Sequence, residues 1–217
     1  MNERFAFDLG RGAPPVVAGA DEAGRGCLAG PLVAAAVCFD YATFDADDYE
    51  ALDALDDSKR LTPERRSSLY REVLRRALQV CVVAFSPATI DACGLHVTNL
   101  AALARALEGL HPAPAVALVD GFPLPACELP HEAVVGGDHT SAAVAAASVV
   151  AKVTRDRLMR RLHERHPEYR FDRHFGYATE LHHAAIAEHG VCELHRLSFQ
   201  SVAYRQLGLP LGDDAPA

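Results

Sequence analysis

The stretch VVAGADEAGRGCLAGPLVAAAVCF, residues 16–39, decides how the fold begins. Two apolar runs in it, Val16–Ala20 and Pro31–Phe39, have the composition and the Gly or Pro borders of buried strands. Only a tight glycine-rich link separates them, so we expect an antiparallel hairpin. In a regular strand Asp21 and Glu22 would face opposite sides of the sheet, so both reach one site only if the chain bends there. The nearby glycines supply that freedom.

The rest of the chain alternates further strands with helices. We expect strands at Val80–Phe85, Ala115–Val119 and Glu132–Val135, and helices at residues 63–78, 87–93, 96–110, 140–165, 178–188 and 199–208. Residues 41–57 are expected to be a loop or an acidic surface helix. This order predicts an α/β fold with a five-stranded mixed sheet flanked by helices. We expect one domain over residues 1–217, with a helical C-terminal part at about 178–209 and a loose tail at 210–217.

Composition places the chain among ordinary globular proteins. Half of the 217 residues are hydrophobic and 23% are charged. The N-terminal sequence lacks the apolar core of a secretory signal, and no apolar run is long enough for a membrane span, so we expect a cytoplasmic protein. The six cysteines contain no C-x-x-C pair, which disfavours a zinc site built on paired thiols or a disulfide framework. No heptad or apolar surface pattern is visible, and we expect a monomer.

Charge is unevenly distributed along the sequence. The net charge of −8 would disfavour a phosphate-binding protein. However, residues 1–58 carry twelve acidic and three basic side chains, whereas the remaining residues carry seventeen acidic and eighteen basic ones. Lys152–Arg173 alone holds eight basic residues against four acidic ones. The local charge therefore permits a polyanionic ligand.

Three aspartates are expected at the ends of predicted strands. Asp21 follows the first strand, Asp120 the fourth and Asp138 the fifth. Ligand sites of α/β sheets collect at strand ends, so these residues are candidates for one shared site. Each also has an ordinary explanation, because Asp is common in turns and caps the N-termini of helices.

Several longer motifs occur in a fixed order. They are DEAGRG-x-x-GP at Asp21–Pro31, DSK-x-L at Asp57–Leu61, VDG at Asp120, a long block from Asp138 to Asp156, F-x4-GY-x-T at Phe171–Thr179 and HR-x-SF at His195–Phe199. In this order they resemble ribonuclease HII, the type 2 branch of the ribonuclease H superfamily, across nearly the whole chain. Residues 41–57 and 122–131 carry no signature of that family.

The resemblance implies a ribonuclease H-like fold and four catalytic, metal-binding carboxylates: Asp21, Glu22, Asp120 and Asp138. The chemistry suits this set, because two divalent ions about 3.5–4 Å apart can activate water and stabilise the leaving oxygen in phosphodiester hydrolysis. Mg²⁺ and Mn²⁺ prefer oxygen ligands, and the sequence does not distinguish between them. Clustered carboxylates also raise one another's pKa, so we expect the site to be strained without metal.

The resemblance further implies a substrate-binding set. The backbone of Gly24, Arg25 and Gly26 would recognise the 2′-hydroxyl group that distinguishes RNA from DNA, and Tyr177 would pack on the neighbouring sugar. Expected phosphate contacts are Lys59 and the helix face that bears Ser148, Lys152 and Arg155. A half-buried structural tyrosine and a solvated face for Arg157, Arg160 and Arg161 remain alternatives. The histidines are interpreted mostly as surface residues, and His195-Arg196 as structural.

Together these observations predict an endonuclease that hydrolyses the RNA strand of RNA–DNA hybrids. The resemblance implies cleavage on the 5′ side of ribonucleotides embedded in duplex DNA, with 3′-hydroxyl and 5′-phosphate products, in the service of ribonucleotide removal. Related type 3 enzymes carry an added N-terminal domain, for which we expect no room before Val16. Two alternatives are a DNA-cutting nuclease on the same fold and a non-catalytic hybrid-binding protein. The glycine motif and Tyr177 disfavour the first, and the complete set of acids disfavours the second.

Overall fold

A computed structural model describes residues 2–11, 15–199 and 202–208. The described residues form two compact units. The sheet unit contains the residues up to Ala23, Val33–Ala84 and Asn99–Val153. The helical unit contains Gly24–Leu32, Phe85–Thr98 and the described residues from Thr154 onward. The single domain stays a prediction, and the predicted loose tail at 210–217 lies outside the described residues.

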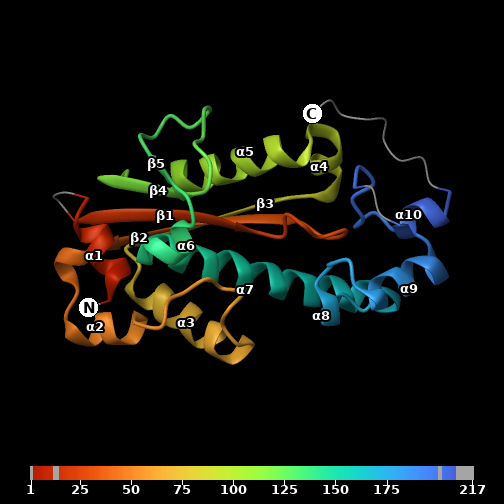
Figure 1. The fold of residues 1–217 in the computed structure, drawn as a ribbon, viewed down its shortest axis with the longest axis horizontal. Coiled ribbons are helices and arrows are strands. Elements are labelled where there is room, and N and C mark those ends of the chain that lie inside the picture. The colour runs from red at the N-terminus through yellow and green to blue at the C-terminus, as the bar shows by residue number, and fades with distance from the viewer. Residues whose placement is uncertain (1, 12–14, 200–201, 209–217) are drawn as a thin grey trace. The chain divides into compact units, whose positions relative to one another are not determined.

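Figure 1 shows the order of the elements along the chain. The strands are β1 Val16–Ala23, β2 Leu32–Asp40, β3 Gln79–Phe85, β4 Val116–Asp120 and β5 Glu132–Val134. The α-helices are α1 Glu3–Leu9, α2 Ala46–Leu52, α3 Pro63–Arg76, α4 Pro87–Cys93, α5 Leu95–Glu108, α6 Gly137–Thr140, α7 Ala142–Arg165, α8 Phe171–His174, α9 Glu180–His189 and α10 Val202–Gln206. Two 3₁₀ turns, η1 Tyr41–Thr43 and η2 Pro167–Tyr169, complete the elements that the described residues form.

The five strands form one mixed sheet in the order β3-β2-β1-β4-β5, as predicted. β1 pairs with β2 antiparallel, and β4 is parallel to both β1 and β5. The β1–β2 ladder runs unbroken through Asp21 and Glu22, which pair with Ala35 and Ala34. The strand therefore continues past its predicted end at Ala20 and ends at Ala23.

The first part of α7 packs closely on the sheet. All six residues of Ala142–Ala147 are fully buried. A Cβ atom added to Gly19 in β1 would lie 2.2 Å from both the carbonyl carbon of Ala143 and the backbone nitrogen of Val144. Since backbone atoms cannot move aside as a flexible side chain does, glycine at 19 and the small residues of α7 together permit this approach.

The predicted helix at 140–165 is interrupted near its start. Ser141 adopts an extended conformation, with φ −111° and ψ 133°, and separates α6 from α7. Gly136, in the left-handed conformation, precedes α6, so Asp138 lies inside this short helix and does not cap it. Asp138 is thereby held near the end of β5, in a helix distinct from the one that packs on the sheet.

The helical unit has its own small core. It is built from two groups of buried side chains, one containing Met159, Tyr169 and Phe171, and the other Leu28, Ile186 and Tyr204. The predicted helix at 178–188 is present as α9, which Thr179 caps through its side chain. The predicted helix at 199–208 is present in its described part as α10, whereas η2 and α8 were not predicted.

Over the described ranges, the structure has no helix with the length and apolar character that crossing a membrane requires.

Candidate active site

The predicted aspartates lie near the carboxyl ends of three neighbouring parallel strands of the sheet unit, Asp21 within β1, Asp120 at the end of β4 and Asp138 in α6 after β5. Ala20 pairs with Val119, so Asp21 and Asp120 come next on adjacent strands. Asp120 in turn pairs with Val134 at the end of β5, and α6 with Asp138 follows. The backbone N–H of Gly137 donates a 2.7 Å hydrogen bond to Oδ1 of Asp120. The start of α6 is therefore bonded directly to the carboxylate that ends β4.

Electrostatic interactions connect these carboxyl groups. Asp21 is only 6% exposed, and burial raises its pKa well above the ordinary value, with the charges of Glu22 and then Asp120 adding to the rise. Burial also raises the pKa of Asp138, and the charge of Asp120 again adds to it. The structure thus brings all four predicted acids into one region where their negative charges disfavour one another.

Two residues outside the predicted set belong to the same region. Oxygen or ring nitrogen atoms of Asp57, Asp138 and His139 lie within 4.8 Å of one another. Nδ1 of His139 is 3.3 Å from Oδ1 of Asp56, and its Nε2 is 3.9 Å from Oδ1 of Asp138. Asp57 stands in the quoted DSK motif and could have been noted from it. His139 was grouped with the mostly surface histidines, because the sequence does not show that it lies close to Asp56.

The three residues of the sheet unit that were predicted to contact phosphate, Lys59, Ser148 and Lys152, differ in how far they are exposed to solvent. Lys59 is exposed, and its backbone N–H donates to Oδ1 of Asp57 at 2.9 Å. Lys152 is partly buried. Ser148 is only 3% exposed, its Oγ lies 3.0 Å from Oγ of Ser58, and its hydrogen bond to Asp21 opposes the rise in the pKa of that residue. With only 3% of its surface exposed, Ser148 is not placed to contact phosphate as predicted, and it lies beside Asp21.

In the helical unit, the predicted Gly24-Arg25-Gly26 segment begins a loop that ends at Pro31. Gly24 has φ +98°, and a Cβ atom there would lie 2.1 Å from Nε of Arg155. Gly26 is exposed, and an added Cβ would meet nothing within 4 Å. The first glycine is thus required by the conformation and packing of the loop, whereas the second leaves open space beside the backbone.

Two fully buried arginines hold this loop by its carbonyl oxygens. Arg155 donates from Nε to Pro31 at 2.9 Å and from Nη2 to Ala29 at 3.0 Å. Arg196 donates from Nη1 to the carbonyl of Arg25 at 3.0 Å, and from Nε and Nη2 to that of Gly30 at 3.1 and 2.9 Å. Burial, followed by the charge of Arg155, lowers the pKa of Arg196 to about 10.

The prediction that Arg155 contacts phosphate is therefore wrong. Its third nitrogen, Nη1, donates to the carbonyl of Phe175 at 2.9 Å, and the side chain has no exposed surface. A long cation of this kind is ordinarily solvated, but here the loop carbonyls replace water as acceptors. The structural role expected for His195-Arg196 is consistent with the burial of both side chains and with the bonds that Arg196 makes.

Tyr177 lies in a segment bonded to the same loop. The carbonyl of the preceding Gly176 accepts hydrogen bonds from the backbone N–H groups of Leu28 at 2.8 Å and Ala29 at 3.3 Å. Tyr177 is half-buried, and burial raises the pKa of its hydroxyl. Its carbonyl lies 2.9 Å from Nδ1 of His182. The helical unit therefore brings Tyr177 and the glycine segment together on one hydrogen-bonded framework.

His182 makes the stability of this framework sensitive to acid. It is fully buried, its ring stacks on His174 with centroids 4.2 Å apart, and its Nε2 lies 3.2 Å from Nε2 of His195. Burial, followed by the charge of His174, lowers its pKa to about 3. An unfolded histidine binds a proton near pH 6.5. The neutral ring therefore contributes stability that is complete above about pH 6.5 and is lost as the pH falls toward 3.

We expect the free energy of unfolding to fall by about 2–3 kcal/mol between pH 6.5 and pH 4.5 through His182 alone. The measurement is urea unfolding across this range for the wild type and His182→Gln, with the exposed His111→Gln as the matched control. The His182 variant should be less stable at pH 7 but should show a shallower decline below pH 6.5. An unchanged decline in that variant would contradict the assignment.

Comparison with known proteins identifies the family. The family model described as Ribonuclease HII matches residues 18–202. The chain belongs to the ribonuclease HII family. Relatives with that name include the protein of Paraburkholderia xenovorans, which is 45% identical over 93% of this chain and 79% of its own length. The protein of Delftia acidovorans is 48% identical over 88% of this chain and 78% of its own length. A crystal structure of ribonuclease H2 from Pyrococcus horikoshii has a TM-score of 0.72 at 27% identity and covers 88% of this chain and 96% of that one.

Membership of the ribonuclease HII family confirms both the resemblance found in the sequence and the ribonuclease H-like fold. The chain is accordingly an enzyme of the ribonuclease H class, which hydrolyses RNA in RNA–DNA hybrids. The matched region begins in β1 and ends in α10, so it includes every predicted site residue.

Proposed function

We propose that this ribonuclease H cuts on the 5′ side of ribonucleotides embedded in duplex DNA, as well as within RNA–DNA hybrids, and leaves 3′-hydroxyl and 5′-phosphate ends. The observation that carries the proposal is the convergence of Asp21, Asp120 and Asp138 near the carboxyl ends of three adjacent parallel strands, with Glu22 beside Asp21. Such an activity would serve the removal of misincorporated ribonucleotides. We further propose that the enzyme acts as a monomer in the cytoplasm.

The acid cluster fits divalent metal ions. Its donors are carboxylate oxygens, and burial together with mutual repulsion raises the pKa of Asp21 and Asp138. Hard cations such as Mg²⁺ and Mn²⁺ prefer oxygen ligands and would offset this repulsion. We propose that Asp21, Glu22, Asp120 and Asp138 hold two such ions. When bound, the ions supply activation of a water nucleophile and stabilisation of charge on the leaving 3′-oxygen.

The surrounding groups of the sheet unit orient the carboxylates. The N–H of Gly137 fixes Oδ1 of Asp120 at 2.7 Å, and Ser148 bonds to Asp21. A carboxylate held in one orientation needs little reorganisation when it takes up its ligand. Lys59, which is exposed, and Lys152 remain the proposed contacts to substrate phosphates, which position the duplex without recognising its sequence.

Selectivity for ribonucleotides is assigned to the helical unit. We propose that backbone groups of Gly24, Arg25 and Gly26 recognise the 2′-hydroxyl, which is the group that separates RNA from DNA. The open space beside exposed Gly26 supports this role, since a side chain there would obstruct an approaching ribose. Arg196 fixes the carbonyl of Arg25 and so holds the segment in shape. Tyr177 is proposed to pack on the neighbouring sugar.

One assay separates this proposal from its alternatives. The substrate is a labelled DNA duplex with a single embedded ribonucleotide, compared with an all-DNA duplex of the same sequence, in Mg²⁺, Mn²⁺ or EDTA. We expect a single cut 5′ of the ribonucleotide with either metal and none in EDTA. Cleavage of the all-DNA duplex would instead indicate a DNA nuclease. Cleavage of a continuous hybrid without cleavage at the single ribonucleotide would refute the proposed junction specificity.

A further inference from the structure

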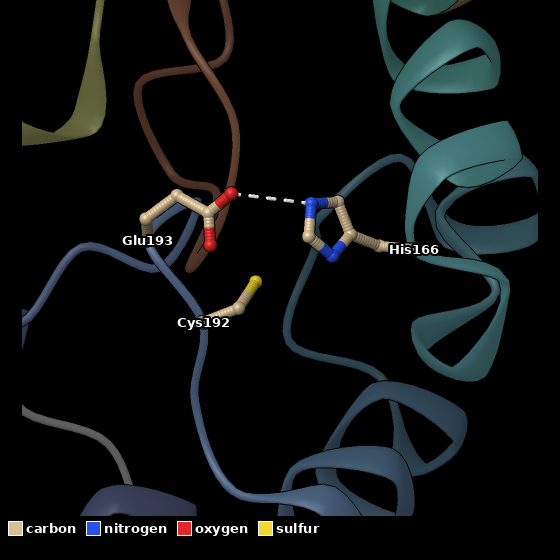
Figure 2. A group of neighbouring side chains, drawn as sticks. All are labelled: His166, Cys192 and Glu193. Atoms are coloured by element: carbon tan, nitrogen blue, oxygen red, sulfur yellow. Dashed lines mark ion pairs between the residues drawn. The ribbon is translucent and has the colours of Figure 1, made fainter.

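Three side chains of different types that can bind metal ions, a histidine, a cysteine and a glutamate, lie together in the helical unit. They take no part in the proposed reaction. Figure 2 shows His166, Cys192 and Glu193 with their functional groups turned toward one another. One donor atom from each residue lies within 4.8 Å of the other two. Nε2 of His166 is 3.2 Å from Oε1 of Glu193. Donors around a tetrahedral zinc ion, bound at about 2.0–2.3 Å, lie about 3.3–3.8 Å apart, so the three donors would need to approach one another by at most about 1.5 Å to bind one.

Backbone hydrogen bonds fix the positions of both His166 and Cys192. His166 directly follows α7, and its N–H donates to the carbonyls of Leu162 at 3.0 Å and His163 at 3.2 Å. Cys192 begins a turn that the N–H of His195 closes by donating to the Cys192 carbonyl at 3.0 Å. The N–H of Cys192 donates back to Nδ1 of His195, also at 3.0 Å. The sulfur of Cys192 also lies 3.3 Å from Nδ1 of His195, a contact that the thiol would exchange for the metal ion.

A further carboxylate lies on the opposite side of the imidazole ring. Nδ1 of His166 is 3.5 Å from Oε1 of Glu168, whereas Nε2 faces Glu193. Histidines that bind metals through one ring nitrogen commonly donate the other N–H to a carboxylate, which fixes the tautomer and orients the ring. An ion pair between His166 and Glu193 alone does not require this arrangement. Glu168 occupies the position of such a carboxylate, at an ion-pair distance from Nδ1 of His166.

We propose that His166, Cys192 and Glu193 bind a zinc-like divalent transition-metal ion. Sulfur and imidazole nitrogen are the ligands that Zn²⁺ prefers and Mg²⁺ avoids, so this site differs in selectivity from the all-oxygen acid cluster. One thiolate and one carboxylate balance the charge of the ion. A water molecule would complete four-coordination, and Glu193, whose side chain is 68% exposed, gives access from solvent.

Binding would also change the state of Cys192. An ordinary cysteine thiol has a pKa of about 8.5, so the sulfur carries a proton at neutral pH in the absence of metal. As the metal–sulfur bond forms, the S–H bond breaks and the proton passes to solvent, so binding weakens at low pH. The bound ion would link the end of α7 to the turn that immediately precedes Arg196. Metal binding should therefore stabilise the segment that holds the glycine loop.

Cobalt(II) is a suitable probe, because it occupies zinc sites and a cobalt–thiolate bond produces an intense near-ultraviolet absorption band. We expect the metal-free full-length protein to develop this band at one equivalent of Co²⁺ and to lose it when Zn²⁺ is added. Cys192→Ser should abolish the band, and the matched control Cys93→Ser, at an exposed cysteine, should retain it. Absence of the band in the wild type, or its persistence in Cys192→Ser, would overturn the proposal.

A second variant addresses the possibility that changes at Cys192 disturb folding. Glu193→Gln alters an exposed side chain and should leave the fold intact, yet it should weaken Zn²⁺ binding at least about tenfold by calorimetry, because an anionic ligand is lost. Asp120→Asn in the acid cluster should leave this affinity unchanged. Loss of Zn²⁺ binding in Asp120→Asn, or unchanged affinity in Glu193→Gln, would place the ion elsewhere.

Discussion

Asp120→Asn should lower the rate of cleavage at an embedded ribonucleotide by on the order of 10³-fold or more. Asparagine has the same shape as aspartate and keeps a side-chain oxygen that accepts the Gly137 N–H, which lies 2.7 Å from Oδ1 in the wild type. The fold at the end of β4 should therefore persist while the negative charge is lost. Single-turnover rates in saturating Mg²⁺ measure the effect on chemistry apart from substrate binding.

The same variant should change the response to metal in a way that a folding defect would not. Without metal, Asp120→Asn should melt at a higher temperature than the wild type, because the charge of Asp120 opposes ionisation of both Asp21 and Asp138. With Mn²⁺ the order should reverse, since the wild type gains more from binding. Asp47→Asn, at an exposed carboxylate of the sheet unit, should change neither rate nor metal response. Equal Mn²⁺ stabilisation of Asp120→Asn and wild type would exclude Asp120 as a ligand.

The sequence predicted the sheet well because its signals are local. Apolar runs with glycine and proline borders identified all five strands, and the short link predicted the antiparallel β1–β2 pair. The break at Ser141 was missed because Thr140 and Ser141 both resemble residues that begin a helix. The N-terminal helix α1 was also missed, although the side chain of Asn2 caps it. Its burial depends on distant partners, such as Tyr41, whose hydroxyl donates to Asp8 at 2.6 Å.

The residues of the candidate site could be predicted where a sequence motif identifies them. They could not be predicted where their position or burial depends on tertiary packing. The four acids follow from their strand ends and the family resemblance. Helical spacing correctly places Ser148, Lys152 and Arg155 on one face, but it cannot tell whether water or protein covers that face. Arg155 is buried because carbonyls of a loop far away in sequence accept its hydrogen bonds. The position of His139 near Asp138 and Asp56 likewise depends on the folded chain.

Substitution of Arg196, whose guanidinium group is buried, is the second change for which we expect a large effect. Its planar group donates to the carbonyls of Arg25 and Gly30 at once, through three nitrogens. A lysine has one compact ammonium group and cannot reproduce this fork. Arg196→Lys should therefore lower the free energy of unfolding by about 3 kcal/mol, since buried hydrogen bonds to a charged group are lost. Urea unfolding measures this loss, with the exposed Arg173→Lys as the matched control.

Arg196→Lys should also impair recognition of the ribose, which a loss of global stability alone would not do. At a temperature where the variant remains folded, cleavage at a single ribonucleotide should fall by about 10²-fold, because misplacing a positioning group by about 1 Å has an effect of this size. Cleavage of a long hybrid, which offers a 2′-hydroxyl at every step, should fall less. The ratio of the two rates is therefore the decisive measurement. Equal reductions on both substrates would show that Arg196 supports the fold without positioning the Gly24–Gly26 segment. A lowered ratio would show that a residue expected to be merely structural sets the specificity of the enzyme through the carbonyl of Arg25.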